Sequence, residues 1–149
     1  MIRTIATLLS AVAMAAPAFA ESHSVGDVEA GEKAFKKCAT CHVVADAEGE
    51  ILAGRKAKTG PNLYGIIGRH AGTVEGFRYG KSIVAAGEAG LIWDLENFAV
   101  YAQDPKAFLQ EILDDKKARS KMSYKVRDEE DAVNLGAFLA SLAPVEEES

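Results

Sequence analysis

Apolar residues recur at helical spacing near both ends of the chain. In the first stretch Val28, Ala34 and Phe35 alternate with charged positions, which predicts an amphipathic helix over 28–38. A second long helix is predicted over 128–142, where four acidic residues open the segment and suit the positive end of a helix dipole. The apolar stripe of this last helix consists of Ala132, Leu135, Phe138, Leu139 and Leu142. Three shorter helices are predicted between the two, over 81–86, 95–102 and 105–113.

Residues suited to helix starts stand where these patterns begin. Asp27 and Asp94 each precede a predicted helix as a candidate N-cap, and Asp104 is followed by Pro105 at a first helical position. Gly31 lies inside the first long helix, where glycine costs about 1 kcal/mol relative to alanine. We therefore expect another backbone, that of the last helix, to approach closely at this glycine.

The middle of the chain, from residue 43 to residue 79, has no regular periodicity and predicts loops without strands. It holds seven glycines, and a structureless loop of this length is unusual inside a small domain. Apolar and aromatic side chains are nevertheless frequent there: Leu63, Tyr64, Ile66, Ile67, Phe77 and Tyr79. A large cofactor wrapped by these loops would account for both features. Gly87 is predicted to end the short helix that follows.

The only two cysteines of the chain form the motif Cys38-Ala39-Thr40-Cys41-His42. This pattern is typical of covalent haem attachment, in which two thiols bind the porphyrin and the adjacent histidine reaches the iron. A dithiol redox pair and half of a zinc site share the shorter Cys-x-x-Cys pattern. Haem attachment is favoured because it also gives His42 a role.

The first twenty residues have the features of an export signal. Arg3 provides a basic start, an apolar run follows, and Ala18-Phe19-Ala20 resembles a cleavage site. We expect cleavage after Ala20, which leaves a single soluble domain over 21–149 with an acidic C-terminal tail. The periplasm of a bacterium is the simplest destination, and free cysteines would not persist in such an oxidising space.

Few side chains could complete the coordination of a haem iron opposite His42. Met122 is the one methionine outside the predicted signal, and His23 and His70 are the other histidines. His23 falls in a polar lead-in and His70 in a glycine-flanked turn. Met122 has polar neighbours in the sequence, which a methionine of the hydrophobic core would not be expected to have. We therefore expect Met122 to bind the iron. Thioether ligation raises the reduction potential and leaves no open position, which suits electron transfer.

Charge is unevenly distributed along the chain. The formal net charge is −5, and it becomes −6 once Arg3 leaves with the signal, which argues against nucleic acid as a partner. Between residues 106 and 127, however, the chain has seven basic residues and only three acidic ones. A solvated face would explain this run, and so would a docking surface, which we favour because Met122 lies inside it.

Several motifs together resemble class I cytochromes c, most closely the bacterial cytochrome c2/c550 branch. The motifs are Cys38–His42, Gly60-Pro61-Asn62-Leu63-Tyr64-Gly65, Gly76-Phe77-Arg78-Tyr79, Trp93 with Tyr101, and Lys121-Met122. The resemblance implies an all-α fold of about five short helices wrapped with loops around one covalently bound haem c. Segments 46–54 and 106–121 are longer than in mitochondrial relatives.

The resemblance also implies roles on the two sides of the iron. Pro61 should present its carbonyl to the ring N–H of His42, and such partners fix the tautomer and raise ligand basicity. Tyr101 should lie near the Met122 sulfur, and Ser120 stands where the family often has threonine.

Three further residues are expected around a buried haem propionate. Tyr79 and Trp93 should hydrogen-bond this group, and Arg69 should offset its charge. The crossing of the first and last helices should bring together Gly31, Phe35, Leu135 and Phe138.

As a function, the resemblance implies a periplasmic carrier of single electrons. The donor would be a cytochrome bc1 complex, and the acceptor a photosynthetic reaction centre, a terminal cytochrome oxidase, or both. Transient docking of a monomer would use basic residues around the haem edge: Lys33, Lys37, Arg55, Lys56, Lys58, Lys116, Lys117, Lys121 and Lys125. Alternatives are a haem enzyme or sensor of peroxidase-like type with a displaceable sixth ligand, and a thiol-disulfide oxidoreductase.

Overall fold

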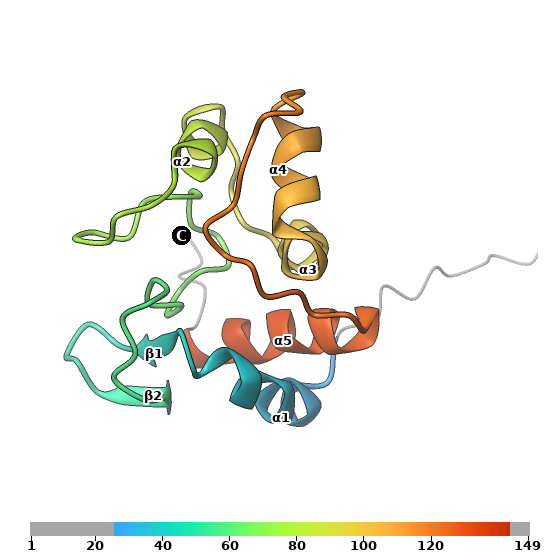
Figure 1. Cartoon of the computed structure of the whole chain (residues 1–149). Helices are drawn as coiled ribbons and strands as arrows, with labels where there is room; N and C mark the ends of the chain where they lie inside the picture. Colours follow the sequence, from blue (N-terminus) through green and yellow to red (C-terminus); the bar gives the residue numbers. More distant parts are fainter. Residues whose placement is uncertain (1–25, 144–149) are drawn as a thin grey trace, which may run out of the picture.

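The computed structural model describes residues 26–143, so the expected signal peptide, His23 and the acidic tail lie outside the described residues. Helices α1 (Val28–Cys38) and α5 (Glu129–Leu142) cross near the two ends of this range, as Figure 1 shows in blue and red. Asp27 caps α1 by accepting a hydrogen bond from the Ala30 N–H, at 2.8 Å. Asp128 caps α5 in the same way. Both predicted long helices are confirmed.

The crossing of α1 and α5 depends on Gly31. A Cβ atom at this position would lie 2.0 Å from the carbonyl oxygen of Asn134, so only glycine lets the two backbones come this close. One turn further along, the rings of Phe35 and Phe138 pack with their centroids 5.6 Å apart. The Asn134 side chain, itself buried, accepts a hydrogen bond from the Asp27 N–H at 2.7 Å. The expected close approach is therefore confirmed.

Three shorter helices follow the central loops: α2 (Lys81–Glu88), α3 (Leu95–Gln103) and α4 (Pro105–Ile112). Asp94 caps α3 in a reciprocal arrangement with Asn97, and Asp104 caps α4 ahead of Pro105, as predicted. The prediction that Gly87 ends α2 was wrong, because the helix continues through it to Glu88. Gly87 instead allows α2 to pack closely against the preceding loop, since a Cβ there would lie 2.0 Å from the carbonyl oxygen of Ala71.

A short β-hairpin corrects the prediction that the chain has no strands. Strands β1 (Val43–Ala45) and β2 (Ile51–Gly54) pair antiparallel, with an irregular register after Val44. The turn between them closes where Asp46 accepts a hydrogen bond from the Glu50 N–H, at 2.8 Å. Only Val44 is fully buried, so strands this short give no alternating pattern in the sequence.

The chain between α4 and α5 returns through the middle of the molecule, where Figure 1 shows it in orange, first between α2 and α4 and then between α3 and α5. It is fastened to α3 by a hydrogen bond from the Val126 N–H to the Ala102 carbonyl, at 2.9 Å. Val126 joins a core that also contains Trp93, Leu109 and Leu139. Within residues 26–143, no helix is both long and apolar enough to cross a membrane. The fold is the expected all-α arrangement, with the small hairpin added.

Candidate haem site

The Cys-x-x-Cys-His motif occupies the end of α1 and the tight turn that follows. The backbone N–H groups of Cys41 and His42 both donate to the Cys38 carbonyl, at 3.0 and 2.9 Å. This turn gathers two thiols and one imidazole within a single helical turn. Both cysteines are free thiols in the structure and are half-buried.

The imidazole of His42 is held from behind. Its Nδ1–H donates to the carbonyl of Pro61 at 2.9 Å, the contact that the resemblance implies. Burial lowers the pKa of His42, and the hydrogen bond to Pro61 opposes that effect. The ring is therefore neutral near pH 7, and Nε2 keeps the lone pair that a metal ligand needs.

Gly60 leaves the space that the His42 ring fills. A Cβ atom at this position would lie 2.3 Å from Cε1, 2.5 Å from Nδ1 and 2.7 Å from Nε2 of the ring. Because no residue other than glycine leaves this room, Gly60 and Pro61 together determine where the imidazole lies. Sequence reasoning missed Gly60 as a site residue, although it opens a motif that was noted.

The electrostatics of Cys38 do not suit thiol-disulfide chemistry. Burial, assisted by the neighbouring Cys41, raises the pKa of the Cys38 thiol to about 11, against a smaller opposing effect of Lys37. Reactive cysteines in redox motifs have lowered pKa values, since the thiolate is the nucleophile. A site for covalent thioether formation with a cofactor has no such requirement.

The loop after Pro61 is tied together by Asn62 and Arg69. The Asn62 side chain accepts from the Ala45 N–H and donates to the Ala45 carbonyl, at 3.0 and 2.6 Å, which joins this loop to β1. Arg69 donates to the carbonyls of Tyr64 and Asn62, at 2.8 and 3.1 Å. Asn62 was overlooked as a site residue, and the Gly-Pro-Asn sequence was the available signal.

Arg69 and Tyr79 lie close enough for their charges to interact. Burial raises the pKa of Tyr79 and lowers that of Arg69, and the charge interaction between the two opposes both shifts. Trp93 is connected to the same region, since its backbone N–H donates to the Arg69 carbonyl at 2.9 Å. Trp93 and Tyr79 are thus each linked to Arg69, Trp93 through its backbone and Tyr79 through a charge effect, and a shared propionate remains a prediction.

Trp93 and Tyr101, both expected near the haem, belong to one aromatic cluster. The Trp93 ring lies 4.9 Å from that of Tyr101 and 6.0 Å from that of Phe108, measured between centroids. Tyr101 also packs edge-on against Phe108, at 5.7 Å. Burial raises the pKa of Tyr101, so its hydroxyl stays protonated and available as a donor. Phe108, on α4, is a member that sequence reasoning missed.

Met122 lies in a segment held by side-chain hydroxyls. The Met122 N–H donates to Ser120 Oγ at 3.1 Å, and the hydroxyls of Ser120 and Tyr101 are 3.4 Å apart. Met122 itself is half-buried. His70, the competing candidate, is exposed and pairs its backbone with Ile92 as an isolated bridge.

The candidate docking residues fall into different settings. Lys33 is paired with Glu29 at 2.8 Å, and both side chains are largely exposed. Lys125 is paired with Asp104, and Lys121 donates to the Arg78 carbonyl at 2.8 Å. The remaining residues of the set are exposed and make no ion pair within the described range: Lys37, Arg55, Lys56, Lys58, Lys116 and Lys117.

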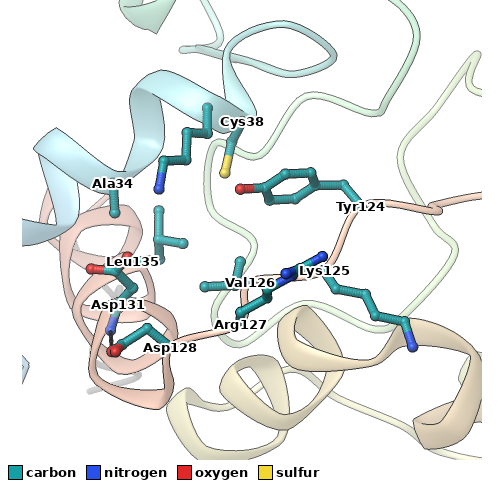
Figure 2. A pocket seen from close by; sticks show the side chains of 10 residues that line it. Ala34, Cys38, Tyr124, Lys125, Val126, Arg127, Asp128, Asp131 and Leu135 are labelled. Atoms are coloured by element: carbon teal, nitrogen blue, oxygen red, sulfur yellow. Dashed lines mark hydrogen bonds between the residues drawn. The ribbon is translucent and has the colours of Figure 1, made fainter.

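A cavity of about 200 Å³ opens beside the first cysteine. Figure 2 shows the Cys38 sulfur and the Tyr124 hydroxyl pointing toward each other at its rim. Lys37 and Arg127 also line it. The thioether side of the site is therefore close to the surface, and its border carries basic residues together with Asp128 and Asp131. Tyr124 was not predicted, although an aromatic residue two positions after Met122 was a visible signal.

These residues fit a covalently attached haem. The two thiols are free to form thioethers, and the His42 imidazole fits in the space left by Gly60. Pro61 binds only Nδ1 of this imidazole, so Nε2 is available to the iron. An all-α fold with such a site defines a c-type cytochrome.

Comparisons with known proteins agree. Cytochrome c-551 of Roseobacter denitrificans is 55% identical over 144 residues, covering 96% of this chain and 97% of that protein. Cytochrome c2 of Rhodovulum adriaticum is 58% identical over 122 residues, covering 82% and 97%. The solved structure of cytochrome c2 from Rhodobacter sphaeroides matches with a TM-score of 0.78 and 53% identity, covering 79% of this chain and 97% of that one. No protein-family model matches the chain.

The chain belongs to the bacterial cytochrome c2 family, whose relatives here include cytochromes c-550 and c-551. It is an electron-transfer protein rather than an enzyme, and its cofactor is covalently attached haem c at the Cys38–Cys41 motif. The alternatives of a haem enzyme and of a dithiol oxidoreductase are thereby set aside.

Proposed function

We propose that this protein carries single electrons through the periplasm, with His42 and Met122 as the axial ligands of its haem iron. The observation that carries the proposal is the paired support of the two candidate ligands. Pro61 fixes the imidazole through Nδ1, and Ser120 fixes the backbone at Met122. A site held from both directions changes little on oxidation, which favours fast electron transfer. The haem supplies the redox change, and a sulfur ligand favours its ferrous state.

Absorption spectroscopy tests the ligand assignment. The ferric wild-type protein is expected to show the sulfur-to-iron band at the red end of the visible spectrum, and Met122→Ala should abolish it. Ser123→Ala changes the adjacent exposed residue and serves as the control, with the band retained. A wild-type protein without this band, or a band that survives in Met122→Ala, would contradict ligation by Met122.

We further propose that Tyr79 and Trp93 bind a haem propionate, and that Arg69 offsets its charge. Their proximity supports this assignment, since the Trp93 backbone N–H donates to the Arg69 carbonyl and the Arg69 charge acts to lower the pKa of Tyr79. The expected effect of Arg69→Gln is a lower reduction potential, because an uncompensated anion stabilises the ferric state. Protein-film voltammetry measures this shift, and an unchanged potential would count against the role of Arg69.

The cytochrome bc1 complex is the proposed electron donor, and a photosynthetic reaction centre or a terminal oxidase the acceptor. Exposed lysines beside the cavity at Cys38 would steer the protein to acidic partner surfaces. Oxidation by host membranes in light and in darkness distinguishes the acceptors. Light-driven oxidation indicates a reaction centre, and oxygen-dependent oxidation in the dark indicates an oxidase.

Charge reversal tests the docking surface. Lys37 lines the cavity beside Cys38, so Lys37→Glu should lower the second-order rate with membranes on the order of fivefold at low salt, with the difference shrinking as salt rises. Lys36→Glu is the matched control, since Lys36 is an exposed lysine on the same helix, lies outside the proposed set and does not line this cavity. Equal rates for both variants, or a rate insensitive to salt, would refute the proposed surface.

Export and processing complete the proposal. Cleavage after Ala20 is supported by the pattern of residues 1–20. Protein recovered from the periplasm should have an N-terminal sequence that begins at Glu21 and a mass that matches residues 21–149 with one haem. Size-exclusion chromatography should show a monomer. A protein retained in the cytoplasm with Met1 in place would contradict this assignment.

A further inference from the structure

The segment that carries Met122 is attached to helix α2 as well as to its own neighbours. The backbone N–H of Arg119 donates to Ser82 Oγ at 3.0 Å, across 37 positions of sequence. Two residues later, Lys121 Nζ donates to the Arg78 carbonyl at 2.8 Å. Its side chain also lies over Gly80, where an added Cβ would come within 3.3 Å of it. Both contacts join residues 119–121 to the start of α2.

These contacts differ from the one that Ser120 makes. Ser120 accepts the Met122 N–H within the same segment, and its one contact with another element is with the Tyr101 hydroxyl of α3, at the long distance of 3.4 Å. Ser82 belongs to another element, and that element is itself anchored, because Gly87 of α2 packs directly against the backbone at Ala71. A hydrogen bond to Ser82 therefore holds the Met122 segment in place relative to α2, which is a fixed part of the fold.

We propose that Ser82 is a positioning residue that keeps Met122 on the haem iron. This inference rests on the proposed ligation of the iron by Met122. In this proposal the segment shifts away from α2 when the thioether leaves the iron, and the bond between Arg119 and Ser82 is broken. The bond therefore favours the closed state of the segment over the open one, and an external ligand can bind iron only in the open state.

Ser82 is better suited to this role than Lys121. The Lys121 ammonium is exposed at the end of a flexible side chain, and water can replace its partner at little cost. Ser82 is half-buried, has one rotatable bond, and occupies the second position of a helix. Both hydrogen bonds are exposed, but removing the Ser82 hydroxyl releases a backbone N–H of the Met122 segment itself, whereas removing the lysine releases only the end of a side chain.

Imidazole binding to the ferric haem-loaded protein measures how readily the segment opens. The apparent affinity scales with the fraction of molecules in which the iron is accessible. A hydrogen bond of this kind changes an equilibrium by about two- to tenfold. Ser82→Ala should therefore bind imidazole about two- to tenfold more tightly than the wild type, and the Arg119 amide should exchange hydrogen faster by a similar factor.

Two further variants make the result specific. Ser82→Thr keeps the hydroxyl and should bind imidazole as the wild type does. Ser141→Ala removes a hydroxyl that donates to the Phe138 carbonyl at 2.7 Å on α5, so it controls for the loss of a serine hydrogen bond far along the chain from α2. Its imidazole affinity should be unchanged.

The possible outcomes distinguish the proposed role of Ser82 from the proposed ligation of the iron by Met122. If the wild-type protein lacks the sulfur-to-iron band, ligation by Met122 fails, and the proposed role of Ser82 fails with it. If the band is present but Ser82→Ala binds imidazole with wild-type affinity, the role of Ser82 alone is overturned. Tighter binding that Ser141→Ala reproduces would also overturn it, because the effect would then be one of general stability.

Discussion

Replacement of Gly60 by alanine is the sharpest test of how the haem ligand is held. The added Cβ would lie 2.3 Å from Cε1 of His42, whereas ordinary contact begins at 3.4 Å. The ring would therefore have to move by about 1 Å. Gly60 does not have a left-handed backbone, so the substitution acts through this contact and not through backbone strain.

The expected magnitude has two contributions. Overpacking of this severity costs roughly 1–3 kcal/mol. A displacement of about 1 Å also takes Nδ1 beyond hydrogen-bonding range of the Pro61 carbonyl, now 2.9 Å away, which costs about 1 kcal/mol more. Loss of this acceptor makes His42 a less basic ligand and disfavours the ferric state. The reduction potential should rise by roughly 40 mV, the one-electron equivalent of about 1 kcal/mol.

Denaturant titration and protein-film voltammetry on the haem-loaded protein measure the two effects. Gly49→Ala is the control, because Gly49 has a positive φ of 85° and no neighbour within 4 Å of an added Cβ. It should lose about 1 kcal/mol through backbone strain and leave the potential unchanged. If Gly60→Ala kept the wild-type potential and lost no more stability than Gly49→Ala, the proposed restraint on His42 would be wrong.

Three other predictions concern stability. Gly31→Ala should lower the free energy of unfolding by about 3 kcal/mol, because the helix crossing must open, and a denaturation midpoint near that of the wild type would refute the tight contact. Asn134→Ala should cost about 1–2 kcal/mol by leaving the Asp27 N–H without its acceptor, and faster exchange of that amide would identify the cause. The hydrogen bond from Lys125 holds the pKa of Asp104 below its usual value of 3.8, so the carboxylate contributes stability above that pH and loses it as the pH falls further. Asp104→Asn keeps a capping residue but should differ most from the wild type near neutral pH and converge with it in acid, and a constant difference at all pH values would contradict this linkage.

The helices could be predicted from sequence because their determinants are local. Asp27, Asp94 and Asp104 each cap the helix that immediately follows, and the apolar stripes have the helical period. Gly87 was misjudged because a helix-ending glycine and a contact glycine look alike until the neighbouring loop is placed. The hairpin at Val44 was missed because its strands are too short to alternate.

The residues of the haem site likewise include some that could be predicted from local sequence and some that could not. The cysteine motif is contiguous and could be recognised directly, and the Gly60-Pro61 segment could be recognised by resemblance. Ser82 could not be found, because its partner is a backbone N–H 37 residues away and a serine at the start of a helix is unremarkable in sequence. A hydrogen bond between distant elements has no periodicity and becomes visible only when the chain is folded.

The crossing of α1 and α5 also has a consequence in time. Gly31 and Asn134, which meet at the crossing, are about 100 residues apart, so at typical synthesis rates α1 exists for roughly 5 to 20 s before its partner has been made. Throughout that interval the helix that ends in Cys38 lacks α5, the helix against which Phe35 packs, and contacts this distant form slowly. The two thiols therefore remain exposed on an unfinished chain, and the last helix to be made is the one that closes the fold around them.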